Sequence, residues 1–225
     1  MDIKTLIIVS FVTLSMLTIT SYVLMRHFPT DKSLKYFFAF SFLFFIGQIF
    51  TGLRNIIPDF FSIIIGNNLL ISGHILLYIA VRGLLSMEVR WYNRYFIPIG
   101  VVLMGFIFFT YFIYDIQMRI VIFSLFCALY GAIIGWLFWE HASSEFKILN
   151  RFTAILFFLS TVMFIVRAVK STVMQLPANY LNNTEITIVL PYIYLIIITI
   201  WLSLVFTLQT KIRNIITSEY KSNKN

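Results

Sequence analysis

The chain has 225 residues, of which 60% are hydrophobic and 12% are charged, and it carries a formal net charge of +8. Soluble domains are roughly 45–50% apolar and about 25% charged. This composition, with a mean hydropathy of +0.91, excludes an ordinary soluble protein and indicates an integral membrane protein. The 17 lysines and arginines are scattered singly, which excludes the clustered basic face of a nucleic-acid-binding protein.

The first apolar run covers residues 5–25, which are 21 residues without a charge. This run is longer than the core of a signal peptide, which has about 7–15 residues, and no small-residue cleavage site follows it. We therefore expect a first transmembrane span that is retained.

Crossing about 30 Å of hydrocarbon takes roughly 20 helical residues. Seven runs qualify or nearly qualify, at about 5–25, 35–53, 60–82, 95–114, 118–139, 152–170 and 187–209. They are continuously apolar and do not alternate with period two, which favours helices over a β-barrel. We predict an all-α polytopic membrane protein, with one seven-helix transmembrane domain over residues 1–210 and a short cytoplasmic helical tail over 211–225.

The basic residues predict the orientation of these spans. With the N-terminus outside, twelve of the 17 lysines and arginines fall in cytoplasmic segments, namely Arg26, Lys32, Lys35, Arg82, Arg90, Arg94, Lys147, Arg151, Lys211, Arg213, Lys221 and Lys224. The other five are Lys4, Arg54, Arg119, Arg167 and Lys170. Because cytoplasmic loops are enriched in basic residues, we expect the N-terminus outside and the C-terminus in the cytoplasm.

Four polar residues interrupt the second and third runs at depth: Gln48, Asn67, Asn68 and His74. On a helix, Asn67, Ile71 and His74 share one face through i, i+4, i+7 spacing. Gly66 and Gly73 lie on the same side, where they would let another helix approach closely.

Two interpretations of these polar residues remain open. Buried polar groups in a membrane are costly unless a neighbour satisfies them. They can form hydrogen bonds between helices, the role we assign to Gln48 and Asn68. Alternatively, they line a polar pocket for a small ligand or a lipid headgroup, the role we assign to Asn67 and His74.

Charged residues gather at the predicted outer ends of the spans: Arg54, Asp59, Asp115, Arg119, Arg167 and Lys170. Asp59 precedes the third span, where capping and the helix dipole would explain it. The three arginines can extend to lipid headgroups. They can also converge on an anionic ligand, or pair with Asp59 and Asp115 across the bundle.

Several chemical functions are not supported by the sequence. The only histidines, His27, His74 and His141, form no i, i+4 pair, and no cysteine or carboxylate lies at ligand spacing, so we expect no metal and no cofactor. Residues 187–209 contain no lysine, which excludes a retinal Schiff base. Cys127 is the single cysteine, so no disulfide framework is expected. We find no catalytic constellation and expect no enzyme activity.

The stretch "LRNIIPDFFSIIIGNNLLISGHILLYIAVRGLL" resembles the second and third spans of the seven-helix N-terminal sensor segments of bacterial GGDEF-type diguanylate cyclases. The positions that carry the resemblance are Arg54, Pro58, Asp59, Ser62, Gly66, Asn67 and Gly73. The opening "MDIKTLIIVSF" is also similar to that family, as are Arg119 after "YDIQM" and Arg167 in "FIVRAV". The resemblance implies a sensory module in the bacterial inner membrane.

The catalytic domain of that family would follow the last span. The 15 residues "KIRNIITSEYKSNKN" contain no GGDEF motif, no phosphate-binding glycine-rich loop and no acidic metal site. Leu208, Ile212 and Ile215 are spaced four and three apart, as at the start of a heptad stripe. We therefore expect a stub of a signalling helix that contacts a separate cytoplasmic enzyme or forms a homodimer.

Together these observations predict a membrane sensory module that binds an unknown small ligand or lipid and transmits through its last helix. The candidate ligand-binding residues are Arg54, Asp59, Asn67, His74, Arg119 and Arg167. The alternative is a structural or partner-binding membrane subunit without a ligand. A small transporter is a third possibility, although no pair of matching broken helices supports it.

Overall fold

The computed structural model describes residues 3–88, 96–173 and 186–222, and the regular structure within these ranges is helical. Six helical segments are long and apolar enough to cross a membrane. They contain α1 (Ile3–His27), α2 (Lys32–Gly52), the π-helix η1 (Phe60–Ile65) with α3 (Gly66–Leu84), α5 (Ile116–Glu140), α6 (Lys147–Val173) and α7 (Ile186–Ser222). The short helix η4 (Ser144–Phe146) precedes α6. The prediction of an all-helical membrane protein is confirmed.

The expected fourth span is shorter than the others. Helix α4 (Phe96–Ile107) continues as the π-helix η3 (Phe108–Phe112), and the apolar part covers Ile97–Phe112. At 1.5 Å per residue these 16 residues reach about 24 Å, less than the roughly 30 Å of a hydrocarbon core. Arg90, Arg94 and the connection over 174–185 lie outside the described residues.

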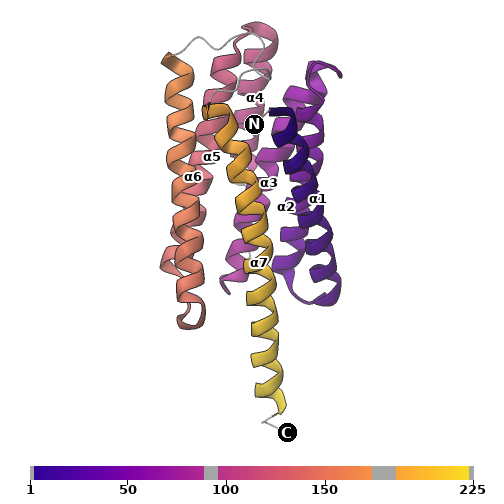
Figure 1. The fold of residues 1–225 in the computed structure, drawn as a ribbon, viewed down its shortest axis with the longest axis vertical. Coiled ribbons are helices and arrows are strands. Elements are labelled where there is room, and N and C mark those ends of the chain that lie inside the picture. The colour runs from indigo at the N-terminus through magenta and orange to yellow at the C-terminus, as the bar shows by residue number, and fades with distance from the viewer. Residues whose placement is uncertain (1–2, 89–95, 174–185, 223–225) are drawn as a thin grey trace.

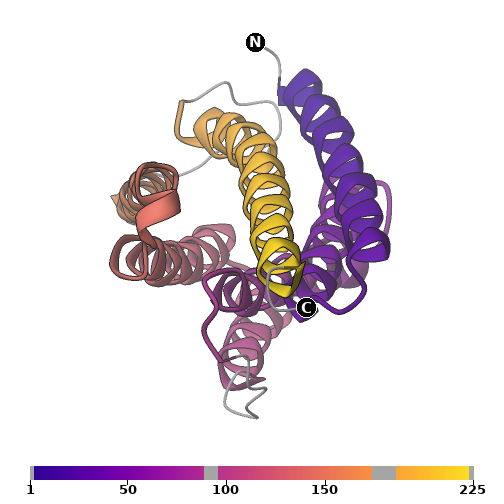
Figure 2. The ribbon, with the colours of Figure 1, turned by 90° about the horizontal axis from the view of Figure 1, so that it is seen from below.

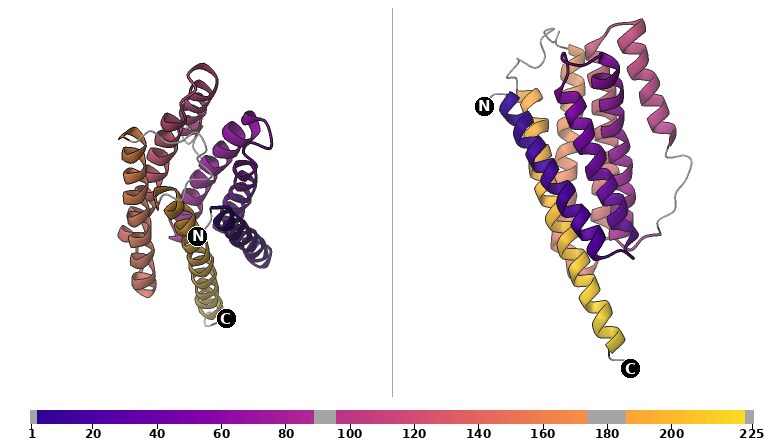
Figure 3. Two further views of the ribbon diagram at one scale, coloured as in Figure 1. Left: turned by 45° about the horizontal axis from the view of Figure 1, so that its top comes forward. Right: turned by 90° about the vertical axis from the view of Figure 1, so that its right-hand side faces the viewer.

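The helices form a bundle in which chain neighbours pack side by side (Figure 1). The pairs α2–α3 and α5–α6 make the most extensive contacts, and α4 lies on the outer side of α3 and α5. Seen along the bundle, α7 lies between α1 and α6 (Figure 2). Its C-terminal part extends beyond the ends of the other helices (Figure 3).

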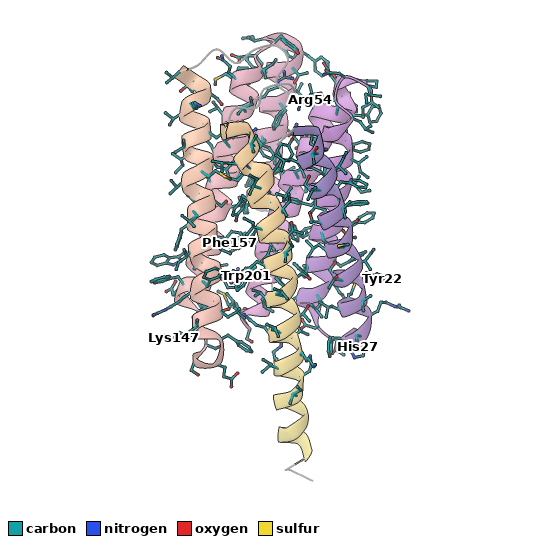
Figure 4. The ribbon with its side chains drawn as sticks, in the orientation of Figure 1. Tyr22, His27, Arg54, Lys147, Phe157 and Trp201 are labelled. Atoms are coloured by element: carbon teal, nitrogen blue, oxygen red, sulfur yellow. The ribbon has the colours of Figure 1, made fainter. Side chains whose placement is uncertain are left out.

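The two ends of the bundle differ. Arg54 lies at one end, which we call the arginine end, and His27 and Lys147 lie at the opposite end (Figure 4). At the opposite end, Asp31 caps α2 by accepting a hydrogen bond from the Ser33 backbone N–H at 2.9 Å. Such a side-chain cap satisfies a backbone donor that the first helical turn leaves unpaired.

The interior is rich in aromatic side chains that join helices distant in sequence. Phe37 of α2 stacks on Phe206 of α7, with ring centroids 3.7 Å apart. Side chains from α1, α2, α3, α5, α6 and α7 belong to one buried cluster. Large apolar side chains such as Met16 and Leu159 instead face outwards and are exposed. Outward apolar side chains are what a lipid-facing surface requires.

Glycines allow α2 and α3 to pack closely. A Cβ on Gly66 would lie 3.0 Å from the Thr51 methyl carbon, and a Cβ on Gly73 would lie 2.4 Å from Cδ2 of Phe44. The close approach predicted for Gly66 and Gly73 is confirmed. Small residues are favoured at such interfaces because van der Waals packing drives helix association in lipid.

We expect Gly73→Ala to destabilise the protein because the added methyl group would displace the Phe44 ring. Overpacking of this kind costs about 1–3 kcal/mol, which lowers the Tm of a chain of this size by roughly 2–12 °C. The measurement is thermal unfolding of the purified protein.

The matched control is Gly100→Ala in α4, where nothing lies within 4 Å of the added Cβ. This variant should be as stable as the parent protein, since alanine favours a helix over glycine. Equal stability of the two variants would contradict the packing argument.

Candidate functional site

One cavity of about 190 Å³ lies between the helices and is lined by residues of α2, η1, α3, α4, α5, α6 and α7. Six of the polar residues singled out in the sequence lie on its wall, namely Gln48, Arg54, Asn67, His74, Arg119 and Arg167. Asp59 and Asn68 do not line it. These six residues come from four separate segments of the chain, and the cavity brings them together.

Arg54 is positioned by the tight turn that follows α2. The Arg54 N–H donates to the Thr51 carbonyl at 3.4 Å, and Asn55 adopts a left-handed conformation with φ of 70°. Asparagine is one of the few residues other than glycine that adopt this conformation readily. The turn ends at Pro58, whose carbonyl accepts hydrogen bonds from the first N–H groups of η1. Arg54 is thereby placed beside the start of the third span.

Arg119 lies in the first turn of α5, where Asp115 caps the helix by accepting from the Met118 N–H at 3.0 Å. The Arg119 side chain is buried. Its Nη1 donates to Thr110 Oγ1 at 3.3 Å, and its Cζ lies 5.0 Å from the centroid of the Tyr114 ring. The guanidinium therefore turns into the bundle, and the cation–π contact helps to hold it there.

Arg167 reaches the same cavity from α6. The three arginines thus belong to three elements: the α2–η1 turn, α5 and α6. The described residues that line the cavity include no aspartate or glutamate. This arrangement favours convergence of the arginines over extension to lipid headgroups, and it gives one end of the cavity a cationic wall.

The neutral polar residues contribute hydrogen-bond acceptors. Gln48 Nε2 donates to Ser10 Oγ of α1 at 3.4 Å, Asn67 Nδ2 donates to a carbonyl one turn earlier at 2.6 Å, and His74 Nδ1 lies 2.9 Å from another such carbonyl. Because a carbonyl oxygen only accepts, the proton of the neutral imidazole is on Nδ1 and Nε2 is an acceptor. Each side chain has one further acceptor atom: Gln48 Oε1, Asn67 Oδ1 and His74 Nε2.

Two predicted residues have other environments. Asn68 Nδ2 donates to the Ile64 carbonyl at 2.8 Å, so its bond stays within its own helix, whereas the interhelical bond predicted for Gln48 is present. Asp59 is exposed and its side chain makes no capping hydrogen bond. The predicted cap is wrong because the Pro58 carbonyl already accepts from the N–H groups of Phe61 and Ser62.

Sequence reasoning missed the apolar part of the wall. On α5 the lining includes Arg119, Phe123, Cys127 and Gly131, and on α6 it includes Phe157, Ser160, Phe164 and Arg167. These residues recur every three or four positions, as one face of a helix does. Extending that face from each arginine would have identified them. The α7 residues, among them Tyr192 and Thr199, give no such signal because no charged residue marks their face.

No family model, no curated protein and no solved structure matches this chain.

We expect the cavity to select reagents by charge. Thr51 lines the cavity beside the arginines, so Thr51→Cys in a Cys127→Ala background should react faster with an anionic thiosulfonate than with a cationic one of similar size. A tenfold ratio corresponds to about 1.4 kcal/mol of electrostatic attraction. The measurement is the rate of labelling of the membrane-embedded protein.

The matched control is Ile56→Cys, which lies in the same turn, is 77% exposed and does not line the cavity. Its ratio of rates should be close to that of a free thiol. A Thr51→Cys ratio no larger than that of Ile56→Cys would show that the wall is not electropositive.

Proposed function

We propose that this protein is a membrane sensory module that binds a small anionic ligand in the cavity and transmits the binding event through α7. The observation that carries this proposal is the meeting of Arg54, Arg119 and Arg167 at one cavity. An anion placed among the guanidinium groups would accept charge-assisted, bidentate hydrogen bonds.

The proposed site is in the outer half of a bacterial inner-membrane protein that crosses seven times, with the N-terminus outside. Arg213 contacts both Asp31 and Gly83, so α2 begins and α3 ends at the same end of the bundle. Lys147, where α6 begins after the short α5–α6 connection, lies at the end opposite Arg54 (Figure 4), so α5 begins near the arginine end. The chain between α3 and α5 therefore returns along the bundle through α4. Impermeant reagents should label Ile56→Cys in sealed, right-side-out vesicles, and labelling only after permeabilisation would contradict this orientation.

The sensory role is also supported by the resemblance to the membrane segments of GGDEF-type cyclases at Arg54, Gly66 and Asn67. In the structure, Arg54 and Asn67 line the cavity, and Gly66 packs against Thr51 of α2. We propose that the output is performed by a separate cytoplasmic enzyme or by a second copy of the chain that meets the extended end of α7.

Helix α7 connects the cavity to the opposite end of the bundle. It contributes Tyr192, Ile198 and Leu202 to the cavity wall. At the same level Trp201 Nε1 donates to Thr153 Oγ1 of α6 at 2.9 Å, and further along Gln209 donates to Asn150. A change at the cavity wall therefore acts on α7, the same helix whose C-terminal part extends beyond the bundle.

At the opposite end, Arg213 forms an ion pair with Asp31 and donates to the Gly83 carbonyl at 3.4 Å. The pair joins α7 to the α1–α2 turn and to the end of α3. Since the side chains are partly exposed, such a contact contributes little to stability. It can still set the position of α7, and a ligand that moves α7 has only a weak restraint to overcome.

We expect Arg119→Gln to reduce the affinity for succinate or inorganic phosphate by about tenfold to a hundredfold, since a hydrogen bond to a charged group contributes about 1.5–3 kcal/mol. Arg119→Lys keeps the charge but loses the bidentate geometry, so its affinity should be intermediate. The measurement is calorimetric titration of the protein in nanodiscs of zwitterionic lipid.

The matched control for this titration is Lys170→Gln. Lys170 lies one turn beyond Arg167 on α6 and does not line the cavity, so its removal should leave the affinity unchanged. Absence of binding by the parent protein to every anion tested would instead favour the structural-subunit alternative.

We expect ligand binding to change the distance between spin labels at Ile215→Cys on α7 and Glu145→Cys in the α5–α6 turn, measured by pulsed electron resonance in a Cys127→Ala background. Asp31→Asn should broaden the distance distribution without ligand, because it removes the charge pair while asparagine still caps α2. Identical distributions with and without saturating anion would contradict transmission through α7.

A further inference from the structure

The cavity is long and follows the axis of the bundle. Its lining on α5 extends from Ile116 to Gly131, and its lining on α7 extends from Pro191 to Leu202. At 1.5 Å per residue these stretches measure about 22 Å and 16 Å. The cavity therefore reaches through more than half of a hydrocarbon core of roughly 30 Å.

The chemistry of the wall changes along this length. The end that holds Arg54, Arg119 and Arg167 is cationic. The far end is about 15–21 Å away by helical rise, and its wall is apolar and mostly aromatic, formed by Phe40, Phe44, Leu77, Phe157 and Leu202. An anion bound at the arginines would leave this apolar end without an occupant.

Between the two ends lies a belt of acceptor atoms. Gln48 of α2 is six residues before Arg54. Asn67 of α3 lies at the same depth as Gln48, because Gly47 packs against Gly66 of the neighbouring helix. His74 lies two turns deeper on α3. One N–H of each amide and the Nδ1–H of His74 already bind protein atoms. The amide oxygens of Gln48 and Asn67 and Nε2 of His74 remain as acceptors, and an O–H or N–H group of a ligand at this depth would satisfy them.

We propose that the ligand is a single-chain anionic amphiphile. Its carboxylate or phosphate head lies among the three arginines, a hydroxyl or amide N–H close to the head donates to the acceptor belt, and its apolar chain extends along the aromatic end. This inference rests on the proposed function, since it names the class of the anion.

The apolar end supplies the reason for preferring a chain over a small anion. Burying a CH₂ group is favourable by about 0.8 kcal/mol, and dry apolar cavities of about 150 Å³ already accept benzene-sized molecules. Rings such as Phe44 and Phe157, which carry no hydrogen-bonding group, offer nothing to water or to an inorganic ion.

A titration series with the unmodified protein in zwitterionic nanodiscs tests the proposal. The probes are acetate, hexanoate, decanoate, 3-hydroxydecanoate, decanol and decyltrimethylammonium, with empty nanodiscs to correct for partition into lipid. We expect affinity to rise with chain length, so that decanoate binds at least thirtyfold more tightly than acetate. Decanol and the cation should bind at least tenfold more weakly than decanoate.

The possible outcomes separate this inference from the proposed function. Equal affinity for acetate and decanoate would overturn the amphiphile while the anion site stands. Equal affinity for decanol and decanoate, or no binding at all, would overturn both. The anionic head can belong to a lipid of the bilayer or to a free acid, and nanodiscs doped with phosphatidic acid distinguish the two. Loss of decanoate binding in these nanodiscs points to a bilayer lipid, and unchanged binding points to a free acid.

The acceptor belt has an internal control in two neighbouring asparagines. Asn67 and Asn68 both donate to a carbonyl one turn earlier, but only Asn67 lines the cavity. We expect 3-hydroxydecanoate to bind about tenfold more tightly than decanoate, and Asn67→Leu to remove this difference while Asn68→Leu keeps it. If 3-hydroxydecanoate still binds more tightly than decanoate to Asn67→Leu, the acceptor belt is not the partner of the hydroxyl group.

Discussion

The placement of three guanidinium groups inside an apolar bundle is the constraint on which much of the structure depends. An ionised group within a membrane protein has to face polar groups, water or an opposite charge. Local features at the arginine end serve this need: the left-handed Asn55 beside Arg54, the Asp115 cap that starts α5, and Thr110 in the π-helix η3, which binds Arg119. π-Helical turns are rare and occur frequently at functional sites. In the chain, η1 follows Arg54 and η3 precedes Arg119, each within seven residues.

The bundle combines two glycine-lined helix pairs with one long helix that packs through larger side chains. Gly47, Gly66 and Gly73 bring α2 and α3 together, and Gly131 and Gly135 bring α5 close to α6. Such pairs resist rearrangement because added volume has nowhere to go. Helix α7 instead packs through larger apolar side chains of the buried cluster, among them Leu202, Val205 and Phe206, with polar contacts at Trp201, Gln209 and Arg213.

The sequence predicted the parts of this structure that depend on local chemistry. Apolar runs located the six long helices, and charges and amides within them identified Arg54, Asn67, His74, Arg119 and Arg167, which meet at the cavity. The sequence could not show how deep in the bundle each residue lies or which side chains of other helices surround it. The cap assigned to Asp59 failed because the backbone of a π-helical turn had already satisfied the donors, and the wall formed by α7 was missed because lipid-facing and cavity-facing apolar residues look alike.

In the proposed mechanism binding and transmission involve the same helix, and Pro191 lies where the two would meet. Pro191 lies within α7 and on the cavity wall, and proline cannot donate the backbone hydrogen bond that would stiffen the helix there. From Pro191 to Ile215 the helix then runs for about 36 Å. A tilt of about 3° at the cavity would move its far end by about 2 Å over that length, comparable to the helix shifts that switch subunit interfaces. Under the proposed function, a ligand that displaces the wall beside Pro191 by this small angle would change the surface that α7 presents beyond the bundle.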